Sequence, residues 1–178
     1  MHDPRGAGAG SRVLGTLVHD KGEAAVRTFL ADQQLVLTQD HRQLTEWVVR
    51  GRYPIGIAIS PEQFKLLADQ GLSIDHVKPL TGDDPGLYGL NAGFGSLMVV
   101  NKAPHPNAVK IFVDWLLSPE GQAIFAEQST YNSRRTDVPV VAPDRAVDPR
   151  LDLVNLAKEK DNHWRERGQE LAREYLKQ

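Results

Sequence analysis

The 178-residue sequence contains no cysteine, and it contains no long apolar run. The absence of cysteine excludes disulfide bridges, thiolate zinc sites, iron–sulfur clusters and cysteine nucleophiles. The longest apolar stretches are short pieces such as residues 97–100, far below the ~20 residues of a membrane-spanning helix. The first residues also lack the apolar segment of a secretory signal.

Charge of one sign is not in excess either. Lys and Arg number 21 against 23 Asp and Glu, which gives a net charge of −2. A protein that binds along nucleic acid needs a basic surface to neutralise phosphates, so we expect no nucleic-acid partner. Hydrophobic residues make up 40% of the chain and charged residues 25%. This composition is typical of a folded chain with one domain or two small ones.

Apolar spacing and turn residues predict helices that alternate with short strands. The helices are expected around residues 13–18, 26–30, 40–50, 60–70, 106–117, 118–125 and 162–177, and the strands at residues 35–37, 54–59 and 97–100. This order predicts an α/β fold with a mostly parallel sheet, followed by C-terminal helices. We expect residues 1–85 to form the α/β domain and residues 86–178 to form a returning strand and a helical segment. The helix at 106–117 is apolar nearly all round, which predicts burial on more than one side.

A glycine-rich loop precedes the first expected helix. Gly6, Gly8 and Gly10 alternate ahead of Ser11, so backbone N–H groups and the positive helix end converge on one place. The dinucleotide-binding pattern needs glycine at position 11 and a strand before the loop, and the Gly-Lys-Ser/Thr triplet of a phosphate loop does not occur. The loop therefore predicts a cradle for an anion or polar ligand; the alternative is a flexible turn that enters a helix.

Signals for metal binding or catalysis are few. The six histidines show neither His-x-x-x-His nor His-Glu-x-x-His spacing, so no metal site is expected. Asp40-His41 is typical of a solvated helix cap, and no Gly-x-Ser-x-Gly elbow is present. Arg134 and Arg135 form either a clamp for a carboxylate or phosphate, or a surface pair in a loop.

Three runs in the second half carry a family resemblance. They are KAPHPNAVK at 102–110, FVDWLLSPEGQ at 112–122 and YNSRRTDVP at 131–139. Together they resemble the C-terminal half of bacterial extracellular solute-binding proteins, and most of all the group usually labelled the periplasmic component of iron(III)-type ABC transporters. DPR at 3–5, GAGS at 8–11 and GRYPIG at 51–56 resemble the same group in the same order, so the resemblance covers most of the chain.

The resemblance implies a periplasmic, non-enzymatic protein without a cofactor. Such a protein has two α/β lobes of the type II periplasmic-binding architecture, binds a solute between them and delivers it to an ABC permease. In that family the loop that enters the helix of the second lobe donates N–H groups to an anion, and the strand after Tyr53 ends at the cleft. The implied ligand-binding residues are Arg5, Gly8, Ala9, Gly10, Ser11, Ser60, Arg134 and Arg135. Ser60 is equally explained as an N-cap.

Two departures from the family pattern refine this expectation. Relatives that bind bare iron(III) commonly use an adjacent tyrosine pair, whereas Tyr53 stands alone and no Tyr-Tyr occurs. The expected solute is therefore a small anion, organic or phosphorus-containing, or a metal complex. The chain also resembles only the second lobe with its returning segment, so the first lobe is missing. It is then a truncated gene product, an excised piece, or a lobe completed by another chain.

Two further expectations follow from the sequence. Apolar residues at 97–125 would cover a first lobe in the family, so we expect the chain to self-associate, most simply as a dimer. A different functional class is also open: a small cytosolic α/β phosphate-binding module or enzyme that uses the loop at residues 6–11. Catalysis would then need a titratable side chain beside the loop, for which Arg5, Arg12 and His19 are the nearest in sequence.

Overall fold

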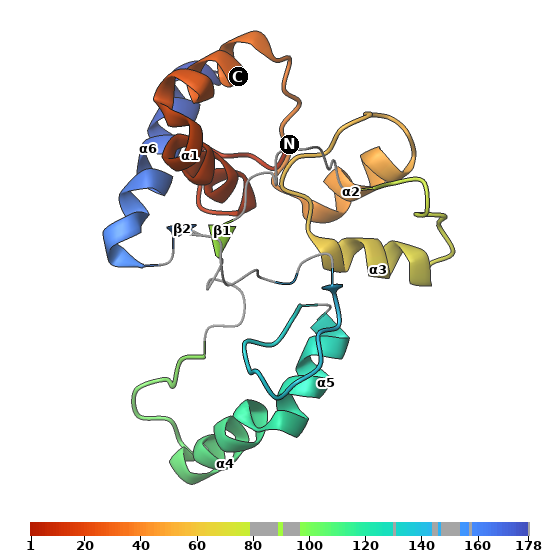
Figure 1. The fold of residues 1–178 in the computed structure, drawn as a ribbon, viewed down its shortest axis with the longest axis vertical. Coiled ribbons are helices and arrows are strands. Elements are labelled where there is room, and N and C mark those ends of the chain that lie inside the picture. Colours follow the sequence, from red (N-terminus) through yellow and green to blue (C-terminus); the bar gives the residue numbers. More distant parts are fainter. Residues whose placement is uncertain are drawn as a thin grey trace. The chain divides into compact units, whose positions relative to one another are not determined.

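The computed structural model describes residues 1–78, 89–90, 97–129, 131–143, 146, 154–156 and 158–177. The chain divides into two units, Met1–Phe94 with Leu153–Gln178, and Gly95–Asp152. The expected boundary near residue 85 lies outside the described residues. The elements in chain order are α1 (Ala9–Asp32), α2 (His41–Val49), α3 (Pro61–Asp69), β1 (Gly89–Leu90), α4 (Pro106–Leu117), α5 (Pro119–Ser129), β2 (Val154–Asn155), the 3-10 helix η2 (Glu159–Asp161) and α6 (Asn162–Tyr175) (Figure 1).

The core of the first unit lies between α1 and α6, which run side by side (Figure 1). Its fully buried side chains include Leu14 and Val26 from α1 and Leu171 from α6. Two glycines, Gly15 of α1 and Gly168 of α6, bring the helix backbones close together. A Cβ placed on Gly15 would lie 2.8 Å from the Cα of Arg165. α1 is kinked at Gly22, where φ is 81°. The helices expected around 13–18 and 26–30 are therefore the two arms of α1 on either side of this kink.

A central extended segment, residues 1–3, holds the rest of the first unit together. On one side, residue 2 pairs in parallel with Thr38, and the N–H of Asp3 donates to the Thr38 carbonyl at 2.8 Å. On the other side, the N–H of His2 donates to the carbonyl of Ile57 at 3.1 Å. β1 and β2 form a separate parallel pair. The described residues thus contain one parallel bridge and one short parallel pair, and not the mostly parallel sheet that the sequence predicts. The full sheet stays a prediction.

Two of the predicted strands are wrong. At residues 54–59 the apolar run predicts a strand buried on both faces, but Ala58 has a φ of 62° and Ile55 is 55% exposed. A left-handed residue interrupts the pleat, and only one backbone bond, from His2 to Ile57, reaches this stretch from the central segment. Residues 97–100 form no strand either, and Met98 is 88% exposed. At residues 35–37 the chain is extended beside residues 1–3 with a single bridge at Thr38.

The predicted helix starts are confirmed where local capping signals exist. The Asp40 carboxylate accepts hydrogen bonds from the N–H groups of Arg42 and Gln43, at 2.8 and 3.1 Å. Pro61 and Pro106 occupy the first turns of α3 and α4, where proline costs nothing because its missing N–H would be unpaired. α5 and α6 also form where the sequence predicts helices.

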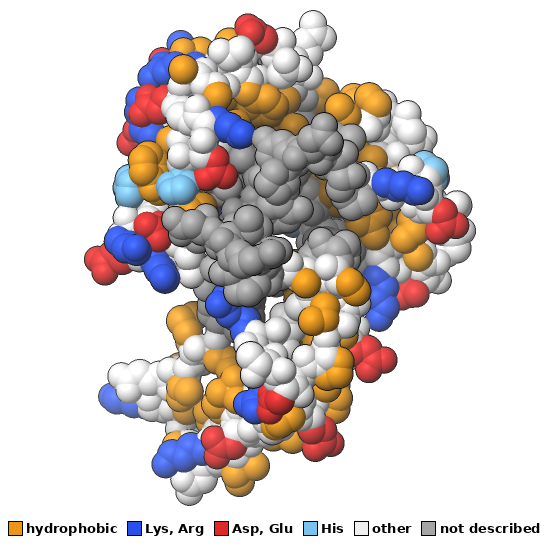
Figure 2. Space-filling view, in the orientation of Figure 1, with side chains coloured by type: hydrophobic (Ala, Val, Ile, Leu, Met, Phe, Trp, Pro, Cys, Tyr) orange, Lys and Arg blue, Asp and Glu red, His pale blue; other side chains and the backbone are white. Residues whose placement is uncertain are grey.

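The second unit is a pair of helices followed by a loop. Asn132 fastens the loop, because its amide donates to the Ala142 carbonyl and accepts from the N–H groups of Val141 and Ala142. The expected burial of α4 on more than one side is wrong, since no α4 residue is buried. Hydrophobic side chains gather on the surface of this unit instead (Figure 2). Those at least 40% exposed include Leu97, Met98, Val99, Val100, Ile111, Phe112, Trp115, Leu117, Ile124, Phe125, Val140 and Val141.

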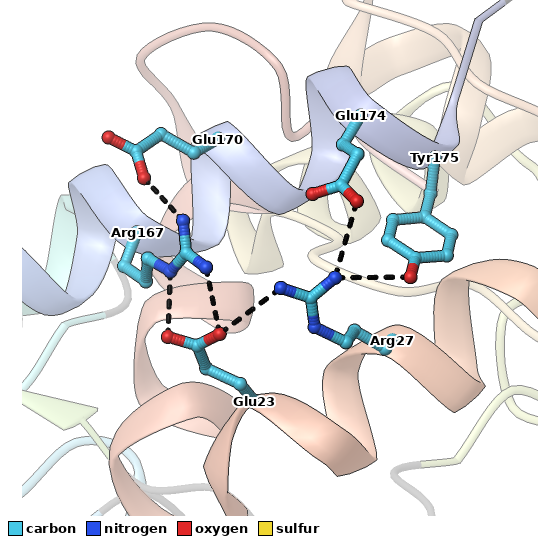
Figure 3. Close-up of polar contacts among 6 residues, drawn as sticks. All are labelled: Glu23, Arg27, Arg167, Glu170, Glu174 and Tyr175. Atoms are coloured by element: carbon cyan, nitrogen blue, oxygen red, sulfur yellow. Dashed lines mark hydrogen bonds and ion pairs between the residues drawn. The ribbon is translucent and has the colours of Figure 1, made fainter.

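An ion-pair network on the surface links α1 to α6 (Figure 3). Glu23 accepts two hydrogen bonds from Arg167, at 2.7 and 2.8 Å, and a third from Arg27 at 3.4 Å. Arg27 in turn donates to Glu174 and to the hydroxyl of Tyr175. The hydrogen bond from Arg167 is the main cause that lowers the pKa of Glu23 to about 2.

The close approach of α1 and α6 predicts that Gly15→Leu destabilises the first unit. Leucine is a good helix former, so the loss would come from forcing the two backbones apart, at a cost of about 1–3 kcal/mol. Urea unfolding followed by circular dichroism measures this loss. Ala24→Leu is the control, because Ala24 is an exposed residue of the same helix. Equal stability of the two variants would contradict the close contact.

The Glu23 network predicts acid sensitivity. The folded-state pKa of Glu23 lies below its ordinary value near 4.5, so its contribution is present above pH 4.5 and is lost as the pH falls to about 2. The free energy of unfolding should therefore fall more steeply in this window for the wild type than for Glu23→Gln. Glu159→Gln removes an exposed carboxylate with no ion pair to a described residue and should keep the wild-type slope. Parallel curves for the wild type and Glu23→Gln would contradict the role of the network.

Candidate functional site

The candidate site lies where the central extended segment ends and helices begin. Residues 1–3 and 36–38 run parallel, so their carboxyl ends lie at one edge. α1 follows the first segment and α2 follows the second. Ile57 contacts the other side of residue 2 and precedes Ser60 by three residues, a span of roughly 10 Å at most. In α/β folds, ligands bind outside the carboxyl ends of strands where neighbouring connections diverge.

The loop at residues 8–11 is built by close contact with residue 2. A Cβ on Gly10 would lie 2.1 Å from the His2 carbonyl oxygen, and a Cβ on Gly8 would lie 2.8 Å from Cε1 of His2. Gly8 also has a φ of 156°, which disfavours any side chain. The N–H of Gly8 donates to the Ser11 hydroxyl at 3.2 Å, and that hydroxyl donates back to the Gly8 carbonyl at 3.0 Å. These two hydrogen bonds connect the loop to the first turn of α1.

Arg5 supports the loop from its outer side. Its guanidinium binds the buried Asp3 carboxylate at 2.8–3.3 Å and donates to the Leu176 carbonyl, while Arg173 donates to the Arg5 carbonyl. The hydrogen bond from Arg5 is the main cause that lowers the pKa of Asp3. These contacts make Arg5 a positioning residue that ties the loop to the end of α6.

Ser60 is buried, and its side chain makes no capping hydrogen bond. Ser60 is therefore the N-cap of α3 only through its backbone: its carbonyl accepts a hydrogen bond from the N–H of Gln63 at 3.1 Å, while its hydroxyl does not cap the helix. A serine hydroxyl both donates and accepts, which suits it to contact a polar solute.

Arg134 and Arg135 lie in the second unit, whereas the glycine loop lies in the first. Both are exposed. Arg135 makes two hydrogen bonds of 2.7 Å to Asp137 and one of 3.0 Å to the Leu117 carbonyl. These bonds fit the surface-pair alternative for Arg135. Its guanidinium braces the loop of the second unit against the end of α4.

Two histidines that the sequence leaves apart meet at the candidate site. The rings of His2 and His41 are stacked with centroids 4.2 Å apart and planes 25° from parallel. His2 is in the central segment and His41 is the first residue of α2. In sequence, Asp40-His41 is typical of a solvated cap, and only the pairing of residue 2 with Thr38 brings the two rings together. His41 is in fact partly buried.

Among the described residues, no group of three or more His, Asp and Glu side chains is placed to hold a metal ion. Nor does the described part of the chain include a helix with the length and hydropathy needed to cross a bilayer.

Comparison with known proteins identifies the family of the chain. Residues 1–128 match the family model described as bacterial extracellular solute-binding protein. No curated protein and no solved structure was found to match the chain. The matched residues include the glycine loop, Ser60 and both helices of the second unit. With most of its length inside this match, the chain belongs to the bacterial extracellular solute-binding proteins.

Proposed function

We propose that this chain binds a small anionic solute as the solute-binding component of an ABC importer. The solute is bound at the carboxyl edge of the first unit, by Gly8, Ala9, Gly10, Ser11 and Ser60. The observation that carries the proposal is the ordered glycine loop at the N-terminus of α1, fixed against residue 2. A helix N-terminus presents unpaired N–H groups and a partial positive charge, and it needs no cationic side chain to bind an anion.

An anionic solute fits the site better than bare iron(III). Iron through phenolates needs a tyrosine pair, and Tyr53 is engaged elsewhere. Its ring packs edge-on against Trp47 at 5.4 Å, and the Arg52 guanidinium lies 5.6 Å from its centre. Neither neighbour is an oxygen ligand of the kind a hard cation prefers.

The periplasmic location and the membrane permease belong to the same proposal. Both follow from the family, whose members are extracellular solute-binding proteins. Arg134 and Arg135 belong to the second unit and are not part of this proposed site, and Arg135 is bound to Asp137.

The alternative, an enzyme that uses the same loop, is less well supported. In sequence, His19 is the candidate histidine for acid–base catalysis beside the loop. It lies 11 residues beyond Gly8 along α1, roughly 16 Å from the helix start. Its ring instead contacts Asp20 at 2.5 Å and packs edge-on against Trp164. A general base must reach the reacting proton directly or through one water, so this distance excludes His19 as the base.

The proposal is tested by Ala9→Pro. Ala9 is the first residue of α1, where proline is tolerated but removes one N–H donor. Losing one hydrogen bond to a charged ligand should weaken sulfate or phosphate binding about 10-fold or more in calorimetry. The control is Ala9→Ser, which keeps the N–H. Unchanged binding by Ala9→Pro would contradict the cradle.

We further propose that the second unit self-associates through its exposed apolar side chains. Trp115 and Phe112 lie 6.0 Å apart on α4 and are 41% and 54% exposed. The wild type should therefore be a dimer in light scattering, and Trp115→Glu should be a monomer with the same helix content. Lys110→Glu changes the charge at an exposed polar position of α4 and should remain dimeric. A monomeric wild type would contradict the proposal.

A further inference from the structure

The stacked histidines lie between the starts of two helices. His2 is 7% exposed, and the Nδ1 of its ring lies 3.3 Å from the position of a Cβ on Gly8, the N-cap of α1. His41 is the first residue of α2. The ring pair therefore lies beside the first turn of α1 and is joined directly to the first turn of α2. Each of these helix ends contributes a partial positive charge.

Each of the two imidazoles has one buried ring nitrogen without a hydrogen-bond partner in the described part of the chain. The Nδ1 atoms of His2 and His41 are buried, and neither has a hydrogen-bond partner among the described residues. Leaving a buried polar atom unpaired costs about 1–3 kcal/mol, so nearly all such atoms are paired in folded proteins. Two such atoms on stacked rings, one facing the start of α1, indicate a polar group that binds there.

The surrounding charges determine the sign of that group. The Asp3 carboxylate is neutralised by Arg5, and the Asp40 carboxylate is used by the first N–H groups of α2. Arg12, one turn along α1 from Gly8, adds positive charge near His2. Burial is the main cause that lowers the pKa of His2, and His41 lowers it further. A backbone hydrogen bond to Asp3 and the Asp3 charge oppose this, and Arg12 has the smallest effect on this pKa. The environment thus resists a proton on His2 until a negative charge arrives.

We propose that His2 and His41 form a proton-coupled oxyanion site at the start of α1, in which the two imidazoles donate hydrogen bonds from Nδ1 to a tetrahedral oxyanion. The inference deepens the proposed function and rests on it, since the same helix end would hold the solute. A neutral imidazole donates one hydrogen bond, and protonation converts this to a charge-assisted bond. Binding of the anion then takes up a proton, so affinity rises as the pH falls through the range in which histidine titrates.

Sulfate is the probe, because its double charge stays constant between about pH 5.5 and 8, the window in which histidine titrates. Calorimetry on the full chain should show binding about 10-fold tighter at the lower pH, as expected when a neutral hydrogen bond becomes charge-assisted. Sulfate should also shift the imidazole NMR signals of His2 and His41, and should raise the melting temperature more at the lower pH.

The variants separate this site from the glycine loop. His41→Asn keeps a neutral amide donor near the position of Nδ1 but cannot titrate, so it should bind sulfate with a weaker pH dependence. His2→Ala should lose most of the affinity. If the buried position 2 does not accept alanine, His41→Asn alone tests the proposal. His105→Asn alters an exposed histidine of the second unit and should behave as the wild type.

Each outcome decides between the two proposals. If the wild type binds sulfate equally at both pH values while Ala9→Pro weakens binding, the loop binds the anion and the histidine site is wrong. If the wild type binds neither sulfate nor phosphate at either pH, the anionic solute itself is wrong. A pH dependence that survives unchanged in His41→Asn would also overturn the inference.

Discussion

The packing of α1 onto residues 1–3 is the constraint on which the first unit depends. The central segment forms backbone hydrogen bonds to Thr38 on one side and to Ile57 on the other, and it leaves no room for a side chain at Gly10. Any residue larger than glycine at position 10 would meet the His2 carbonyl oxygen and lift the helix away. The contact that fixes the fold therefore also fixes where the positive helix end points, and it places the His2 ring beside that end.

The balance of charges around this contact favours the anionic solute that we propose, although the net charge of the chain is close to zero. Both acidic groups close to the site already have partners, Arg5 for Asp3 and the first turn of α2 for Asp40. The groups beside them include helix N–H donors and two imidazoles. Their positions are set by buried backbone contacts, so little reorganisation is needed when charge arrives, which favours affinity. Net charge alone gives no indication of this local field.

The helices were predictable because their signals are local. An aspartate at an N-cap, a proline in a first turn and a glycine at a kink act within one turn of the residue concerned, and Asp40, Pro61 and Gly22 all do so here. Strands depend on partners that are distant in sequence. The apolar run at 54–59 fits a buried strand in composition, yet it gains only one backbone bond to residue 2 and turns at Ala58. Apolar composition cannot specify such pairing.

The same distinction divides the candidate site. The glycine loop and Ser60 could be found because each belongs to a short pattern, whereas the histidine pair combines residues 39 positions apart. Register supplies the missing link: residue 2 lies opposite Thr38, and the chain then needs only Gln39 and Asp40 to reach the first turn of α2. His2, inside the segment of residues 1–3, and His41, just beyond the neighbouring segment of residues 36–38, thus lie at the same edge. Pairing register and helix starts, taken together, would locate such a site where motif spacing does not.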